Sequence, residues 1–252
     1  MARIFDLSLP HQNCGSEPYP PHIVHSDHAE GARRLAALAR VEPTDFPDGL
    51  GLASDQISGS SHSGTHVDAP WHYGPECEGK PARTIDQVPL EWCYGDGVVL
   101  DMRHVPAGGE ITPNHLETAL ARIAYSIKPG DIILIQTGAD KHWNTSRYLS
   151  SQSGLGAQAT AWLLDRGVKV IGIDAWGLDR PAATMGEAFR KGDPNALWPS
   201  HIYGRQREYL QIEKLANLDQ LPRPVGFKVC AFPVKIEGGS AAWTRAVAIL
   251  ED

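Results

Sequence analysis

Residues 61–73 read SHSGTHVDAPWHY, a stretch that places His62, His66, Asp68 and His72 within eleven residues. All four side chains bind metals or transfer protons. A single histidine is usually a core or surface residue, but four such groups this close together predict a reaction centre built around a metal.

The backbone of this stretch is predicted to be extended or looped. Pro70 lacks a backbone donor and pushes Ala69 out of the helical region, while Gly64 weakens a helix on the other side. Side chains of an extended chain alternate between two faces. The four candidate residues all carry even numbers, so we expect them to converge on one face, and the opposite face is then occupied by Thr65, Val67 and Trp71.

The donor atoms narrow the choice of ion. Imidazoles with a carboxylate suit Zn, Mn, Fe or Co, whereas calcium sites use oxygen ligands almost throughout. The cysteines stand far apart without CxxC spacing, which predicts neither a structural zinc site nor a redox pair; they are Cys14, Cys77, Cys93 and Cys230.

Length, composition and net charge predict the number of domains and exclude some classes of partner. With 252 residues, 42% of them hydrophobic, the chain is expected to form one domain over 1–252. A formal charge of −7 argues against nucleic acid or an anionic membrane as the main partner. The sequence has no apolar run long enough to span a bilayer and no pattern of a secretion signal, so we expect a cytoplasmic protein.

Helices and strands are predicted to alternate through the centre of the chain. Apolar or alternating runs predict strands at 4–9, 98–102, 131–136, 168–174, 226–234 and 244–250, the last two joined through Gly238 and Gly239. Helices are predicted at 27–40 and 157–165. A third helix starts from Thr112 as N-cap with Pro113 at its first position and carries apolar residues on one face as far as Ile127. The fold class is therefore α/β with a mixed sheet flanked by helices.

Other histidines and acids leave alternatives open. His201 and Glu213 lie twelve residues apart in residues 198–222 and are plausible further ligands. That spacing proves nothing, and a surface histidine and a solvated helix charge are equally good interpretations. A second histidine cluster near the start of the first helix is more typical of a solvated face than of a pocket lining; it comprises His22, His25 and His28.

The signature itself resembles a known family. HSGTHVDAPWH, residues 62–72, is a complete match to HxGTHxDxPxH of the cyclase family, which includes bacterial kynurenine formamidases and isatin hydrolases. Supporting similarities extend over most of the chain: the DLS near Asp6, the TG at 137–138, the GID at 172–174, and the GGS followed by Arg245. The resemblance implies a swivelling β/β/α domain, in a homodimer or homotetramer.

The resemblance also implies roles for individual residues. Members of the family hold two zinc ions or one manganese, so the implied cofactor is Zn or Mn, as one or two ions. The implied metal ligands are His62, His66, Asp68, His201 and Glu213. His72, the last histidine of the signature, is the implied catalytic residue for proton transfer.

The substrate is expected to be a small aromatic or cyclic molecule. Residues 42–58 and 175–198 look longer than in the compact formamidases and are expected to shape the pocket. Trp71 and Trp176 are candidate substrate-binding residues, with a packed core position as the alternative for Trp176.

Three functions fit these residues. The leading prediction is hydrolysis of an aryl formamide, lactam or lactone by metal-activated water, with His72 as general base. The same residues suit metal-assisted aldol ring closure of a polyketide, because a metal also stabilises an enolate. A metal-binding module without activity is the third possibility, but it leaves His72 without a purpose.

Overall fold

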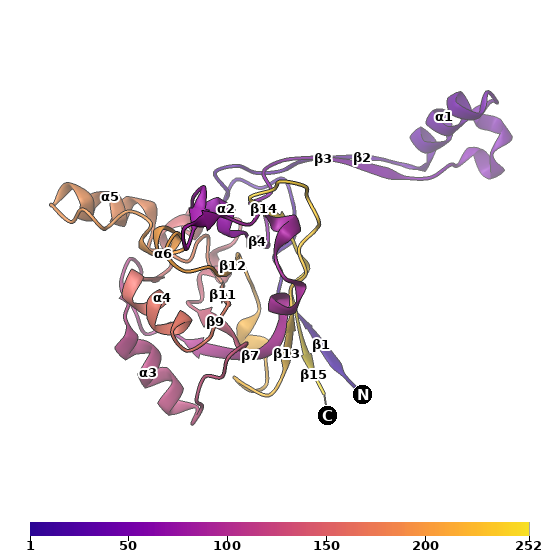
Figure 1. Ribbon diagram of the computed structural model, residues 1–252. Helices are drawn as coiled ribbons and strands as arrows, with labels where there is room; N and C mark the ends of the chain where they lie inside the picture. The colour runs from indigo at the N-terminus through magenta and orange to yellow at the C-terminus, as the bar shows by residue number, and fades with distance from the viewer. Residues whose placement is uncertain (252) are drawn as a thin grey trace.

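A nine-stranded mixed sheet is the centre of the computed structural model, which describes residues 1–251 (Figure 1). The strand order is β1-β15-β13-β7-β9-β11-β12-β4-β14. The strands are β1 (Arg3–Asp6), β15 (Val247–Leu250), β13 (Lys228–Cys230), β7 (Tyr94–Asp101), β9 (Ile132–Gln136), β11 (Val170–Ile173), β12 (Leu210–Glu213), β4 (His66–Asp68) and β14 (Ala241–Trp243). The four strands from β7 to β12 are parallel, and the flanking pairs are antiparallel.

Shorter elements surround this sheet. The helices are α1 (His28–Ala39), α2 (Pro70–Tyr73), α3 (Pro113–Arg122), α4 (Ala157–Leu164), α5 (Ala182–Arg190) and α6 (Pro199–Tyr203). Three two-stranded pairs are formed by β2 (His22–Ser26) with β3 (Ser54–Ser58), β5 (Glu76–Cys77) with β6 (Lys80–Pro81), and β8 (Glu110–Ile111) with β10 (Gly154–Leu155). No helix within residues 1–251 is long and apolar enough to cross a membrane.

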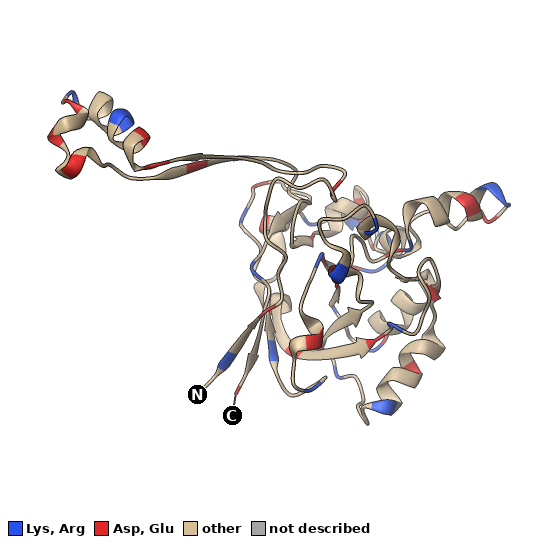
Figure 2. Ribbon diagram, turned by 180° about the vertical axis from the view of Figure 1, so that it is seen from behind, with Lys and Arg blue, Asp and Glu red and all other residues tan. Residues whose placement is uncertain are grey.

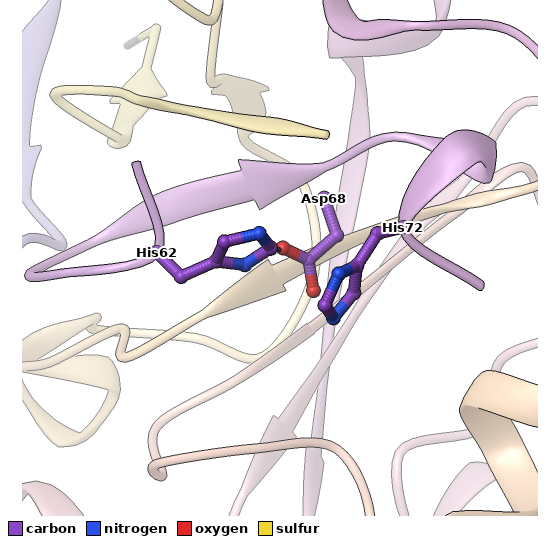
Figure 3. A group of neighbouring side chains, drawn as sticks. All are labelled: His62, Asp68 and His72. Atoms are coloured by element: carbon purple, nitrogen blue, oxygen red, sulfur yellow. Dashed lines mark ion pairs between the residues drawn. The ribbon is translucent and has the colours of Figure 1, made fainter. Parts of the chain in front are cut away.

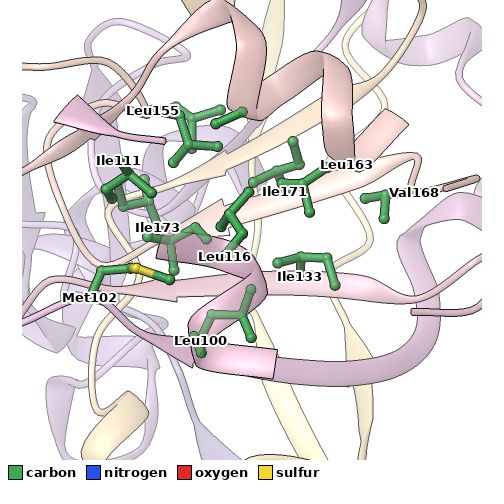
Figure 4. Close-up of a cluster of buried hydrophobic side chains, with 14 of the residues drawn as sticks. Leu100, Met102, Ile111, Leu116, Ile133, Leu155, Leu163, Val168, Ile171 and Ile173 are labelled. Carbon is green, nitrogen blue, oxygen red and sulfur yellow. The ribbon is translucent and has the colours of Figure 1, made fainter. Parts of the chain in front are cut away.

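The central strands are buried on both faces. β9 reads IILIQ and β11 reads VIGI, and every residue of both strands is buried, as expected of parallel strands covered on both sides. Ile133 and Ile135 of β9 face α3 and α4, whose apolar stripes include Leu116 and Leu163 (Figure 4). Ile132 and Leu134, on the opposite face of β9, pack in a second core cluster. Alternation along each strand therefore supplies two cores from one sheet.

The second core forms because the sheet curls. Leu134 and Ile212 of the parallel strands pack in one cluster with Val67 of β4 and with Val229 and Ala248 of β13 and β15. The antiparallel ends of the sheet thus cover the face that no helix covers (Figure 1). This packing fixes β4, which carries part of the histidine-rich signature.

A long arm projects from the body of the molecule (Figure 1). The arm, residues 22–58, consists of the β2–β3 ribbon with α1 at its far end. Charged residues are spread over the arm and α5 (Figure 2). β9 and β11 contain none. α1 buries only three residues, Gly31, Ala32 and Ala36.

Most predicted elements are confirmed, with three corrections. The α/β class with a mixed sheet is confirmed, and Thr112 and Pro113 begin α3 as expected. That helix ends at Arg122 rather than continuing to Ile127, because Ala124 adopts a left-handed φ of 51°. The strands expected at 226–234 and 244–250 are shorter. They are not simply joined by a turn, since β14 lies between them and pairs with β4.

Candidate active site

His66 and Asp68 lie on β4, between β12 and β14. Both side chains are fully buried, and Val67 between them points into the second core cluster. The alternation predicted for the signature therefore holds for these two residues. Because core packing holds β4 on its other face, the two polar side chains are held rigidly.

His62 and His72 reach the same place by other routes. Gly64 takes a φ of +61°, and a Cβ there would lie 2.7 Å from Nδ1 of His11, so this turn needs glycine. His72 belongs to α2, so the expectation of an extended or looped backbone is wrong for the end of the signature. The proline at the first position favours this helical turn. Figure 3 shows the two rings on either side of the Asp68 carboxylate.

Two further side chains come from distant segments. Glu213 ends β12 and lies opposite His66 in the register of β12 with β4. Nε2 of His66 is 3.6 Å from Oε2 of Glu213. Nε2 of His201, on α6, is 3.5 Å from Oε1 of Glu213 and 3.8 Å from Oδ2 of Asp68. The structure thus brings together all five side chains predicted as metal ligands, and their role as ligands stays a prediction.

Three of the imidazoles are oriented by a protein partner at one ring nitrogen. The pairs are His62 Nε2 with Oγ of Ser240 at 3.0 Å, His66 Nδ1 with the carbonyl of Gly64 at 2.8 Å, and His201 Nδ1 with the carboxylate of Asp179. The second nitrogen of each ring faces Asp68, at 2.8 Å for His62 and 3.1 Å for His66. Metal-binding histidines typically use a partner of this kind to fix the ring and its tautomer.

The atoms at the centre fit a divalent cation. Nε2 of His66 and both carboxylate oxygens of Asp68 are buried without a hydrogen-bond partner in the described chain. The short contacts from the rings to Asp68 lack hydrogen-bond geometry, so they do not satisfy these atoms. Buried unpaired polar atoms are costly. A cation bound between the imidazole nitrogens and the carboxylates would remove that cost.

Two groups of ligand atoms have the separation that a metal site needs. In each group the donor atoms all lie within 4.8 Å of one another. The groups are His62, Asp68 and His72, and His66, Asp68 and Glu213. Asp68 belongs to both, which makes it the carboxylate on which the whole arrangement depends.

The pKa values of the two buried acids, Asp68 and Glu213, are shifted in opposite directions. Burial alone would raise the pKa of Asp68, but the imidazoles of His66 and His72 hold it well below its usual range. For Glu213, burial and the nearby Asp68 charge raise the pKa. The two carboxylates therefore oppose each other's ionisation, and a cation between them would favour the charged form of both.

The pKa values of His72 and His201 are also shifted in opposite directions. Loss of water around the ring lowers the pKa of His72 to about 4, so this imidazole is neutral at pH 7 and able to accept a proton. Burial would lower the pKa of His201 as well, but the hydrogen bond and charge of Asp179 raise it to about 9. In the metal-free protein, His201 therefore holds a proton that a metal must displace.

A cavity of about 340 Å³ adjoins these residues, a size that suits one small molecule. Its lining includes His62, His72, His201 and Glu213. Trp176 also lines it, and its role in binding substrate stays a prediction. Trp71 is 44% exposed and does not line this cavity, so the structure does not bring it to the site.

Sequence reasoning missed several lining residues. From the segment 175–198, the structure adds Asp179, Arg180 and Trp198 to the cavity wall, in agreement with the expectation that this segment shapes the pocket. Their only signal in the sequence is the unusual length of that segment. Residues 42–58 do not line the cavity, because β3 and the turns before it belong to the arm.

Comparisons with known proteins support the resemblance seen in the sequence. The family model described as "Putative cyclase" matches residues 5–180. The chain belongs to the cyclase family. A family relative from Bordetella petrii, named kynurenine formamidase, is 33% identical over 192 residues, which cover 76% of this chain and 78% of that protein.

Isatin hydrolases of the same family are similar in sequence and in fold. The isatin hydrolase of Roseibium aggregatum is 27% identical over 217 residues, covering 81% of this chain and 77% of that protein. The solved structure of isatin hydrolase A from Ralstonia solanacearum superposes with a TM-score of 0.77 at 24% identity, covering 99% of this chain and 92% of the other. The cyclase-family fold is thus shared along the whole chain.

Proposed function

We propose that the protein is a metal-dependent hydrolase that cleaves an amide-type carbonyl: an aryl formamide, a cyclic amide or lactam, or a lactone. One observation carries this proposal. Unpartnered buried ligand atoms of His66 and Asp68 face a neutral imidazole, His72, beside a cavity that admits a small molecule. The names of the relatives, kynurenine formamidase and isatin hydrolase, support the same reaction class.

The donor set favours Zn or Mn, because imidazoles and carboxylates suit these ions. The proposed ligands are His62, His66, Asp68, His201 and Glu213, and two groups of donors that share Asp68 leave room for one or two ions. His72 belongs to one of those groups by distance. We assign it to proton transfer rather than to metal binding, because its side chain is open to the cavity.

A bound divalent cation supplies Lewis acidity toward the substrate carbonyl and lowers the pKa of water. His72, neutral at pH 7, accepts the proton of the attacking water and returns it to the leaving nitrogen or oxygen. Asp179 holds the ring of His201 in place through Nδ1. Trp176 offers an aromatic surface for a flat substrate, and Trp71 stays a weaker candidate for the same task.

The arm supports the proposal of a homodimer or homotetramer. A two-stranded ribbon is marginally stable by itself in water. The arm nevertheless exposes apolar side chains, including Leu38 at 81% and Leu52 at 69%. A second copy of the chain that covers them would stabilise the ribbon. Light scattering of the intact chain tests this directly: a monomer at all concentrations would overturn the oligomer.

The activity test uses protein freed of metal with a chelator and reloaded with Zn or Mn. Formanilide, isatin and N-formylkynurenine are offered as substrates. We expect hydrolysis of at least one, lost on chelation and restored by metal, because Nε2 of His66 and both carboxylate oxygens of Asp68 have no hydrogen-bond partner within residues 1–251. Absence of hydrolysis for every carbonyl substrate with metal bound would overturn the proposal. A ring-closed product without oxygen from solvent would favour aldol closure instead.

The role of His72 is tested by His72→Ala, with His22→Ala on the arm as the matched control. Loss of a general base costs roughly 10²- to 10⁴-fold in rate. We expect kcat to fall by that factor while metal content, measured by atomic absorption, is unchanged. A parallel loss of metal would make His72 a ligand and not the base.

A further inference from the structure

The charged residues that line the cavity are paired, with one exception. Nζ of Lys214 lies 3.2 Å from Oε2 of Glu17, and both side chains are nearly fully buried. Asp179 pairs with His201, and Glu213 contacts His201 as well. Each of these five groups therefore has a partner of opposite charge within residues 1–251.

Arg180 is the exception. Its side chain lines the cavity and is partly buried. Within residues 1–251 it forms neither an ion pair nor a side-chain hydrogen bond, and its Nε is buried without a partner. A guanidinium is always charged, and leaving its buried Nε–H without an acceptor costs free energy. A ligand that supplies acceptor atoms in the cavity would satisfy this donor.

The backbone holds Arg180 at this place. The carboxylate of the preceding Asp179 accepts a hydrogen bond of 2.7 Å from the backbone N–H of Ser200, and it also orients His201. On the other side, the backbone of Arg180 is packed against Gly154, where a Cβ would lie 2.2 Å from the Arg180 nitrogen. The residue that orients a proposed metal ligand and the unpaired cation are thus consecutive in the chain.

Two aromatic side chains also line the cavity. Trp176 and Trp198 both line the cavity, and both come from the segment that includes Arg180. An aromatic ring that packs against an indole can place a substituent toward a guanidinium. A planar guanidinium matches a carboxylate with two parallel hydrogen bonds.

We propose that Arg180 binds a carboxylate that the substrate carries in addition to the carbonyl that reacts. The substrate class is then an aromatic amide or formamide with an acidic substituent. This inference rests on the proposed function for the reaction, but the binding of the acidic group is measurable without it.

The kinetic test compares acids with their neutral esters. The substrates are the 2-, 3- and 4-formamidobenzoates and their methyl esters, which differ only in the charge. We expect the wild type to prefer at least one acid over its ester. In Arg180→Met, KM for that acid should rise about 10- to 100-fold, the usual effect of losing a hydrogen bond to a charged group, while values for the ester change less than about 3-fold.

Two further variants separate recognition from a structural role. Arg180→Lys keeps the charge but loses the paired donors, so it should recover part of the preference. Arg33→Met removes an arginine on the arm that pairs with Glu30, and it should behave like the wild type. Equal losses for acid and ester in Arg180→Met, or a wild type without preference, would overturn the inference.

A binding measurement keeps the inference testable if no amide is hydrolysed. The probes are 2-, 3- and 4-aminobenzoate, titrated by calorimetry into metal-free protein so that a metal does not hold the carboxylate. We expect one isomer to bind the wild type and to bind Arg180→Met at least about 10-fold more weakly. If no isomer binds at millimolar concentration, or if both proteins bind equally, Arg180 does not recognise a carboxylate. Failure of hydrolysis together with Arg180-dependent binding would instead reject only the proposed reaction.

Discussion

The sequence contains two groups of three closely spaced histidines, and the structure places them in different surroundings. The arm carries His22, His25 and His28, and the candidate active site carries His62, His66 and His72. On the arm all three are exposed, as predicted for a solvated face. The ring of His25 meets a carboxylate at 2.5 Å, that of Asp55, but the two side chains are 78% and 56% exposed.

The difference teaches that spacing along the chain does not make a metal site. Neither group of close ligand atoms in residues 1–251 includes a histidine of the arm. β2 pairs with β3, which places Asp55 opposite His25, and both side chains remain in contact with water. β4 is paired on both sides, and β12 delivers Glu213 opposite His66. Burial and a second segment supply what local spacing lacks.

The largest effect expected from this comparison is on metal binding. Asp68→Asn removes the carboxylate shared by both groups of ligand atoms, whereas Asp55→Asn removes the carboxylate beside His25 on the arm. Losing a metal and its charge stabilisation costs several kcal/mol, or roughly 10³-fold in kcat/KM. Asp68→Asn should lose both metal and activity, as measured by atomic absorption and initial rates. Asp55→Asn should retain both, and a loss of metal there would break the comparison.

The next effect concerns apolar side chains. Leu134 is fully buried in β9, and Leu52 of the arm is 69% exposed. Leu134→Ala should lower the free energy of unfolding by about 2–5 kcal/mol, and Leu52→Ala by no more than about 0.5 kcal/mol in a monomer. Urea unfolding at two protein concentrations measures both.

Protein concentration sharpens this second test. If the arm packs against another copy of the chain, the effect of Leu52→Ala should grow with concentration, because association stabilises the folded state by mass action. The effect of Leu134→Ala should stay constant. A loss of about 2 kcal/mol in the free energy of unfolding for Leu52→Ala at every protein concentration would mean that this side chain is buried within its own chain. That result would contradict the exposure of the arm.

Local signals predicted much of the fold and half of the site. Composition placed α1, and cap and turn residues placed α4 and the start of α3, because these signals lie within a few neighbouring residues. The end of α3, expected at Ile127, was wrong. His66 and Asp68 followed from alternation along one short strand. These features depend on contacts within a few residues, which a sequence displays directly.

The rest depends on contacts between distant segments. His201 and Glu213 needed the family resemblance, since the pairing of β12 with β4 is set by the curl of the whole sheet. The ribbon of the arm and the pairing of β14 with β4 were missed for the same reason. Arg180 has no local signal, because what distinguishes it is the lack of a side-chain partner anywhere in residues 1–251 of the folded chain.

The smallest expected effect concerns a buried charge in the body. Asp174, directly after β11, is almost fully buried, and burial raises its pKa to about 7 although Thr137 and Gly138 donate hydrogen bonds that favour the charged form. In the unfolded chain an aspartate has a pKa of about 3.9. Between these two values the unfolded state binds fewer protons, so the free energy of unfolding falls as the pH rises.

Asp174→Asn removes that proton linkage. From pH 6 to pH 7 the wild type should lose about 1 kcal/mol more stability than the variant, because a fraction of one proton separates the two states over this range. The decisive quantity is the slope of the free energy of unfolding against pH. The absolute free energies are not decisive, since asparagine also changes the hydrogen bonds to Thr137 and Gly138. Urea unfolding across this pH range gives both slopes. Equal slopes would show that these donors keep Asp174 charged over the whole pH range. The central sheet would then hold a buried carboxylate in its charged form, whereas the carboxylate of Asp55 on the arm is exposed.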